Sequence, residues 1–175
     1  MAPPPVWFER KFRFDFPVEF YPNICIRLRG APARLEELTR GLTREQLIRK
    51  PAGKWSIQEN TGHLLDLEPL FHTRLEDYRR GAESLAPADL TNRATHEARH
   101  NDRPLEDTLS AFRRSRQPMM EAVDALAPAD FARVSKHPRL NQPMRLVDCL
   151  YFIAEHDDHH LAVIWELRPS LRRRD

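Results

Sequence analysis

The chain of 175 residues is long enough to bury one sizeable hydrophobic core. Hydrophobic residues make up 41% and charged residues 31%, a composition that is typical of globular proteins and excludes a disordered chain. The formal net charge is only +2, and Lys and Arg are interleaved with Asp and Glu, so the basic face of a nucleic-acid-binding protein is not expected. The sequence therefore predicts a single domain over residues 1–175 with no nucleic-acid partner.

Signals for export, anchoring or phosphate binding are lacking. The N-terminus has no basic region followed by an apolar stretch, and no run approaches the length that spans a bilayer. Two cysteines, Cys25 and Cys149, form neither a CxxC pattern nor a disulfide framework. None of the five glycines belongs to a GxGxxG or GxxxxGK motif. We expect a cytoplasmic protein without a membrane partner.

Apolar residues recur with helical spacing between prolines, which predicts an all-α four-helix bundle. The expected helices cover residues 32–40, 56–81, 104–126 and 143–167. The second has the clearest start, because Ser56 and Glu59 match a capping box, and Pro69 should bend it. Residues 1–30 are expected to form an irregular cover or, as an alternative, a short strand at 12–16, and residues 82–103 are expected to form a polar connection.

The most informative run is Ala154-Glu155-His156-Asp157-Asp158-His159-His160-Leu161, within the last expected helix. Side chains four residues apart lie one turn apart, so His156 and His160 share a flank of the buried face and can reach one metal ion. His159 projects to the polar side, which predicts a solvated residue. On the second helix His63 also lies at the margin of the core. The alternative for each histidine is a hydrogen-bonded core residue.

Two acidic residues, Asp157 and Glu68, project toward the core. A buried carboxylate requires a hydrogen-bonding or cationic partner. Each could orient an imidazole ligand or act as an acid or base, or pair with an arginine of a neighbouring helix. Cys149 lies on the flank of His156, so it is either a buried apolar-like residue or a thiol in the pocket.

A second motif, His96-Glu97-Ala98-Arg99-His100, matches the HExxH pattern of zinc metalloproteases. That motif requires a stable helix, and its flanks here hold almost no apolar residues. Asn101-Asp102 before Pro104 is typical of the start of the next helix. The pattern therefore favours a solvated loop, which could still form a pocket wall, over a protease site.

The segments Trp55-Ser56-Ile57-Gln58-Glu59-Asn60-Thr61-Gly62-His63-Leu64 and Glu155-His156-Asp157-Asp158-His159-His160-Leu161 together resemble the DinB/YfiT-like metalloenzyme superfamily. The resemblance extends from the first helix to the last. It implies a four-helix bundle of up-down-down-up topology and a divalent metal, often nickel or zinc. The ligands that it implies are His63, His156 and His160.

Characterised members of that superfamily include thiol S-transferases that use bacillithiol, mycothiol or glutathione, and a mycothiol-dependent maleylpyruvate isomerase. The resemblance favours a metal-dependent thiol S-transferase acting on small electrophiles, in which the metal holds the thiolate. Asp157 would orient a ligand, and Arg99 or Asn101 would hold carboxylates of the thiol. The resemblance also implies a homodimer.

Two alternatives stay open. A metal-dependent hydrolase would use metal-bound water with Glu68 or Asp157 as its base. A non-catalytic metal-binding stress protein would close the coordination shell with a fourth protein ligand. The sequence does not identify catalytic residues beyond the metal ligands.

Overall fold

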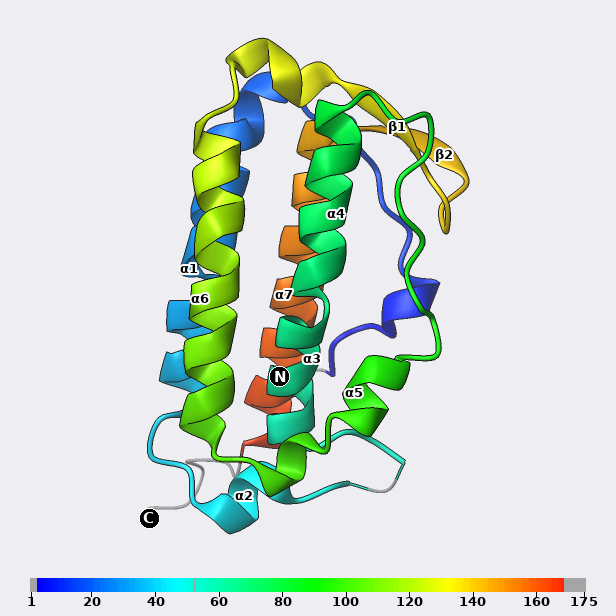
Figure 1. Cartoon of the computed structure of the whole chain (residues 1–175). Helices are drawn as coiled ribbons and strands as arrows, with labels where there is room; N and C mark the ends of the chain where they lie inside the picture. Colours follow the sequence, from blue (N-terminus) through cyan, green and yellow to red (C-terminus); the bar gives the residue numbers. More distant parts are fainter. Residues whose placement is uncertain (1–2, 52, 169–175) are drawn as a thin grey trace.

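The computed structural model describes residues 3–51 and 53–168. It shows four long helical segments arranged as a bundle (Figure 1). Their bounds are α1 Tyr21–Thr39, α3 Ile57–Asp66 continued by α4 Glu68–Arg79, α6 Leu105–Asp124, and α7 Leu146–Leu167. Two short helices, α2 Arg44–Ile48 and α5 Arg93–Glu97, and a hairpin of β1 Val134–His137 and β2 Gln142–Arg145 complete the α-helices and strands of the described residues. Short 3-10 helices occur at Trp7–Glu9, Val18–Phe20, His100–Asp102 and Pro128–Ala132. In the part of the chain that the structure describes, we find no helix with the length and apolarity needed to cross a bilayer.

The helices have the expected up-down-down-up order. In Figure 1, α1 and α7 run in one direction, and α3–α4 and α6 run in the other. Since α4 and α6 are parallel, a tight turn cannot join them, and residues 80–104 run back along the bundle to the far end. This connecting segment, which we call the connector, passes beside α3 and carries α5.

The capping box at the start of α3 is confirmed. Ser56 Oγ accepts from the Glu59 N–H at 3.0 Å, and Glu59 Oε2 accepts from the Ser56 N–H at 2.9 Å. The expected disturbance at Pro69 is also present, because the helix is interrupted at Leu67 between α3 and α4. Proline has no N–H to bond to the preceding turn, so a continuous hydrogen-bond ladder is not possible there.

The first helix begins earlier than predicted, so residues 21–30 are helical and not irregular. Pro22 occupies the first turn of α1, and the buried stripe Ile24, Leu28, Ala31 and Leu35 continues without interruption through Pro32. Proline is typical of a helix start. That preference suggested a start at residue 32, but burial of the longer stripe outweighs the loss of one backbone bond.

The strand expected at residues 12–16 does not form, although its side chains alternate between half-buried and exposed. Phe12, Phe14 and Phe16 pack against the core. No strand pairs with this segment among the described residues. Instead, Arg145 Nη2 donates to the carbonyl oxygens of Phe14 and Phe16 at 3.1 and 3.0 Å. The β1–β2 hairpin was not predicted, because the buried residues of β1, Ser135 and His137, are polar and leave no apolar alternation.

The core consists of two hydrophobic clusters separated by a layer of buried polar side chains. The two clusters lie at different levels along the bundle. One includes Leu28, Phe71, Met119 and Ile153, and the other includes Leu35, Leu64, Phe112 and Leu161. The polar layer between them holds Glu68, Arg116, His156, Asp157 and His160, all less than 8% exposed. Burial of such groups is costly unless each finds a partner.

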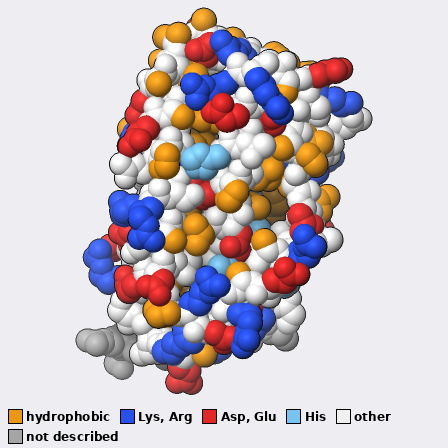
Figure 2. Space-filling model, viewed as in Figure 1, with side chains coloured by type: hydrophobic (Ala, Val, Ile, Leu, Met, Phe, Trp, Pro, Cys, Tyr) orange, Lys and Arg blue, Asp and Glu red, His pale blue; other side chains and the backbone are white. Residues whose placement is uncertain are grey.

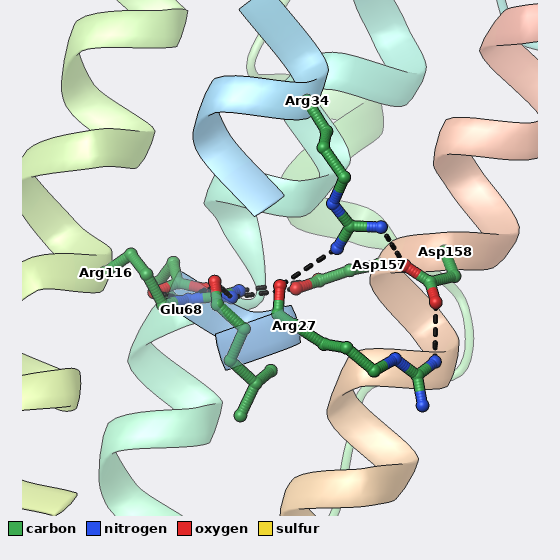
Figure 3. Close-up of polar contacts among 7 residues, drawn as sticks. Arg27, Arg34, Glu68, Arg116, Asp157 and Asp158 are labelled. Atoms are coloured by element: carbon green, nitrogen blue, oxygen red, sulfur yellow. Dashed lines mark hydrogen bonds and ion pairs between the residues drawn. The ribbon is translucent and has the colours of Figure 1, made fainter. Parts of the chain in front are cut away.

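Arg116 connects four helical segments within this layer (Figure 3). Its guanidinium pairs with Glu68 on α4 at 2.6 Å and with Asp157 on α7 at 2.8 Å, and it donates to the carbonyl oxygen of Leu28 on α1 at 3.0 Å. Burial raises the pKa of Glu68 and of Asp157, and the Arg116 charge opposes that shift. Burial would lower the pKa of Arg116, but the two carboxylates raise it instead.

We predict that Arg116→Met lowers the free energy of unfolding by about 3–5 kcal/mol at pH 8, because two buried carboxylates lose their counter-charge. Both carboxyl groups then bind protons more readily in the folded state than in the unfolded state. Stability of the variant relative to wild type should therefore recover as the pH falls toward 5. Urea unfolding at pH 8 and pH 5 measures both effects.

The matched control is Arg29→Met. Arg29 pairs with Asp124 at 2.7 Å on the surface, with both side chains about half exposed, so its loss should cost less than about 1 kcal/mol. A similar loss in both variants, or a loss in Arg116→Met that does not depend on pH, would contradict the prediction.

Candidate metal centre

Three buried histidines converge in the polar layer. His63 on α3 and His156 and His160 on α7 each offer one ring nitrogen, and the three nitrogens lie within 4.8 Å of one another. Their ring centroids are 4.6–5.3 Å apart. These are the three residues that helical projection and the motifs selected, and we refer to them as the triad.

Two members of the triad are held by hydrogen bonds at Nδ1. His63 Nδ1 contacts Thr95 Oγ1 of α5 at 2.9 Å, and His160 Nδ1 contacts Asn60 Oδ1 at 2.9 Å. The Asn60 amide nitrogen donates to the Ser56 carbonyl oxygen at 2.8 Å, which turns Oδ1 toward His160. An amide oxygen only accepts, so Nδ1 of His160 carries the proton and Nε2 keeps its lone pair. Histidines that bind metals usually have such a partner at the other nitrogen.

The third member has no such partner. His156 Nδ1 is fully buried and has no hydrogen-bond partner among the described residues. A buried polar atom without a partner costs free energy, and a metal ion bound at this Nδ1 would remove that cost. Three neutral nitrogen ligands also suit zinc-like and nickel-like divalent ions. The residues present therefore fit a divalent metal.

The electrostatics favour neutral imidazoles. Burial lowers the pKa of His63 to about 4, and burial lowers the pKa values of His156 and His160 well below the ordinary value of 6.5. The neighbouring triad members lower the pKa values of His156 and His160 further. A neutral imidazole is the form that binds a metal, so the triad is ready to bind one at pH 7.

Aromatic side chains surround the triad. Trp55 lies 4.8 Å from His63 and stacks on His160 at 6.2 Å between ring centroids, and Trp7 meets His156 edge-on at 5.0 Å. His159 was expected to be solvated, but it is half-buried, packs 5.6 Å from Trp7 and lines the cavity beside the triad. The N-terminal segment, residues 3–20, covers that flank of α7. A helical projection considers one helix alone, so it cannot show that another segment covers it.

A cavity of about 540 Å³ opens beside the triad, between α4, α7, the N-terminal segment and the connector. Figure 2 shows hydrophobic side chains gathered right of centre on the face in view and again along its top, with basic and acidic side chains interspersed over the remainder. The cavity walls are largely apolar and aromatic, with Trp7, Phe71, Phe152 and Val163 among them. Such a cavity suits a small molecule with an apolar body.

The predicted pocket residues are not in these walls. Arg99 is exposed and pairs with Asp102, and Asn101 accepts from Ser56 Oγ at 2.7 Å. Cys149 is buried in the hydrophobic core, where burial raises the pKa of its thiol to about 11. Both acidic candidates, Glu68 and Asp157, are fully buried and form ion pairs with Arg116. They therefore pair with an arginine of a neighbouring helix, and among the described residues they do not contact the triad as orienting groups.

The HExxH motif does not form a metal site. A short helix holds His96, which is exposed, but Arg99 adopts a left-handed conformation with φ of 51° and ends the helical path. His100 is buried and pairs with Asp66 at 2.8 Å, and it belongs to no metal-binding group among the described residues. The expected solvated loop is therefore only partly correct, because the end of the motif packs against α3.

That packing fastens the connector to the triad helix. Gln58 donates to the carbonyl oxygens of His100 and Arg103, both at 2.5 Å. The His100 ring lies directly against Gly62, where an added Cβ would come within 2.2 Å of it. Glycine at this position lets the connector approach α3 closely enough for Thr95 to reach His63.

Comparison with known proteins agrees with this geometry. Residues 27–164 match the family model described as the DinB superfamily.

The chain belongs to the DinB superfamily.

Among solved structures, this DinB protein resembles YfiT from Bacillus subtilis, described as a probable metal-dependent hydrolase with an unusual four-helix bundle topology. The two share 22% identity with a TM-score of 0.77, over 91% of each chain. A mycothiol-dependent maleylpyruvate isomerase matches at 10% identity and a TM-score of 0.64, over 84% of this chain and 60% of that one. At these identities the two likenesses establish the fold. No match was found among curated proteins.

We predict that Gly62→Ala loosens the connector and destabilises the protein by about 1–3 kcal/mol, because the methyl group overlaps the His100 ring. Hydrogen exchange of the amides in residues 93–103 should accelerate. Gly30→Ala is the control, since the nearest atom, Arg34 Nε, would be 3.9 Å from its Cβ. The Gly30→Ala substitution within a helix should leave the free energy of unfolding unchanged or raise it by about 0.5–1 kcal/mol. A greater loss of stability in Gly30→Ala than in Gly62→Ala would contradict the prediction.

Metal-free protein should lose stability as the pH falls from about 6.5 toward 4. In this range the unfolded chain protonates its histidines, whereas the buried triad stays neutral. Each triad histidine then contributes a slope of about 1.4 kcal/mol per pH unit. His156→Leu should reduce the slope and exposed His96→Leu should not, as measured by urea unfolding after chelator treatment. Equal slopes in all three proteins would refute this assignment.

Proposed function

We propose that the protein is a metal-dependent enzyme, and specifically a thiol S-transferase that joins a low-molecular-weight thiol to a small electrophile. The observation that carries the proposal is the triad, with three convergent neutral nitrogens at the wall of an apolar cavity. A divalent metal held by the triad, nickel or zinc, would supply stabilisation of the bound thiol as a thiolate. Because the protein supplies only three ligands among the described residues, coordination positions on the metal would stay free for that thiol.

The protein's own residues supply orientation and exclusion of water. Thr95 and Asn60 fix the rings of His63 and His160, so their metal-binding nitrogens face one another. Trp7 and Trp55 cover the triad on two sides, which keeps the local dielectric low and strengthens electrostatic stabilisation. The apolar cavity gives the electrophile a place to bind next to the thiolate.

Two observations weigh against the hydrolase alternative. Hydrolysis by metal-bound water requires a general base, and the nominated carboxylates of Glu68 and Asp157 are both paired with Arg116. Neither residue lines the cavity. A bound thiol needs no such base once the metal has lowered its pKa. YfiT is described as a probable metal-dependent hydrolase, and the likeness to it keeps hydrolysis as the second candidate.

The non-catalytic alternative requires a closed coordination shell. Within residues 3–51 and 53–168, the group that could hold a metal contains the three histidines and no fourth ligand. An open position favours catalysis over storage. We also propose, from the family resemblance, a cytoplasmic homodimer with a small-molecule substrate, and light scattering after size-exclusion chromatography measures that oligomeric state.

We predict about one nickel or zinc ion per chain in the wild type, and little metal in His63→Ala and His160→Ala, since each removes one of three ligands. His159→Ala should retain the metal, because His159 lies beside the triad without belonging to it. Elemental analysis of the purified proteins gives this result. Equal metal content in all four proteins would show that the site is misassigned.

The reaction itself is tested with metal-loaded protein, a small electrophile, and bacillithiol, mycothiol or glutathione. Conjugation above background with one thiol, lost in His160→Ala, supports the transferase. Turnover of an ester or amide without thiol supports the hydrolase instead. Metal retention without either reaction supports the non-catalytic alternative.

A further inference from the structure

Two arginines line the cavity away from the triad. Arg74 lies on α4 eleven residues after His63, which corresponds to roughly 16 Å along the two consecutive helices. It is 2% exposed. Arg139 is half-buried in the turn between β1 and β2, and its guanidinium lies over the rings of Trp7, Phe8 and Phe152 at 5.2–5.6 Å. No motif in the sequence marked either residue.

Neither arginine is neutralised by the protein. Among the described residues, no carboxylate forms an ion pair with Arg74 or Arg139. Two acidic residues line the cavity, but Asp89 accepts from Thr91 and from the Arg93 N–H in its own turn, and Glu166 is exposed on α7. The nearby Asp77 accepts from Arg80 and from the Ala86 N–H. A buried guanidinium without a counter-charge is costly.

His137 lies next to Arg74. The neutral His137 ring has a single acceptor nitrogen but faces two donors, the Leu140 N–H at Nδ1 and Arg74 Nη1 at Nε2, both at 3.2 Å. One of these donors is therefore left without an acceptor. Burial, aided by Arg74 and Arg139, lowers the pKa of His137 to about 4, so the ring stays neutral and adds no third charge. Arg74 Nε donates to the Ala86 carbonyl oxygen at 3.0 Å, whereas Nη2 has no protein acceptor among the described residues.

We propose that Arg74, Arg139 and His137 form a subsite for the carboxylate of a small molecule whose apolar body extends along Phe71 and Phe152 toward the triad. A carboxylate offers two acceptor oxygens to the unmatched donors and one negative charge to the two guanidinium groups. The apolar walls between the subsite and the triad exclude a ligand that is polar throughout. The inference rests on the proposed function for the reaction at the triad, and it names the substrate class as a carboxylate with an apolar or aromatic body.

The test compares 4-phenylbutyrate with 4-phenylbutan-1-ol, which has the same body and no charge. Isothermal titration of the full chain at low ionic strength should show the carboxylate binding at least tenfold more tightly than the alcohol. Arg139→Gln should reduce this ratio to about one. Arg99→Gln, which removes an exposed arginine outside the cavity, should leave the ratio unchanged. Circular dichroism and metal content establish that both variants are folded and carry a wild-type triad.

The preference for the carboxylate should be equal in metal-loaded and chelator-treated protein. A preference seen only with metal present would place the carboxylate on the metal and overturn the proposal. A preference that Arg139→Gln retains, or that Lys54→Gln removes in its place, would also overturn it, since Lys54 lines another part of the cavity. The titration measures binding and not turnover. A protein with no enzymatic activity at the triad would therefore still prefer the carboxylate, whereas a protein without the carboxylate subsite would not.

Discussion

The structure depends on burying Arg116 together with two carboxylates at the middle of a bundle that is otherwise hydrophobic. One guanidinium contacts three side-chain or backbone acceptors from α1, α4 and α7, and it is itself part of α6. An isolated charge at this depth would be intolerable, so the four segments must adopt one relative register for all partners to meet. His156 and His160 lie at the same level as Asp157 on α7, so the register that satisfies the charges also aligns the triad.

The same layer continues outward to the surface. Asp158 accepts from Arg34 and Arg27 on α1, and Arg34 donates to the Arg27 carbonyl oxygen at 2.9 Å (Figure 3). Adjacent acidic residues on α7 therefore have different partners, one in the core and one at the edge. Asp158 joins α7 directly to α1, and Asp157 is linked to α1 only through Arg116. The helices α1 and α7 are parallel neighbours without a direct connection in sequence.

The sequence predicted a four-helix bundle from helical periodicity, whereas the topology and the convergence of the triad were implied by the family resemblance. Helix starts were found where a side-chain cap marks them, as at Ser56, and missed where a proline suggests one, as at Pro32. Periodicity placed His156 and His160 on one flank of the last helix and His63 at the margin of the core, and the structure brings the three together.

What the sequence could not predict comes from segments outside the four long helical segments of the bundle. Thr95, Trp7 and Arg139 lie in the connector, the N-terminal segment and the hairpin turn, where no period fixes direction. The burial of His159 likewise depends on a distant segment. Alternation through residues 10–18 was a usable signal for packing, but it suggested a strand, since side-chain alternation does not reveal whether backbone partners exist.

The N-terminal segment has one more consequence. Its backbone bonds to the rest of the protein largely through Arg145, and its Trp7 and Phe8 form a cavity wall that lies outside residues 27–164, the part that matches the DinB family model. One part of the cavity wall therefore comes from a stretch of chain outside the family match, whereas the triad, Arg74 and Arg139 lie within it. Because Trp7 also packs on His156, a change in the N-terminal segment would alter the shape of the cavity and the surroundings of one triad histidine together.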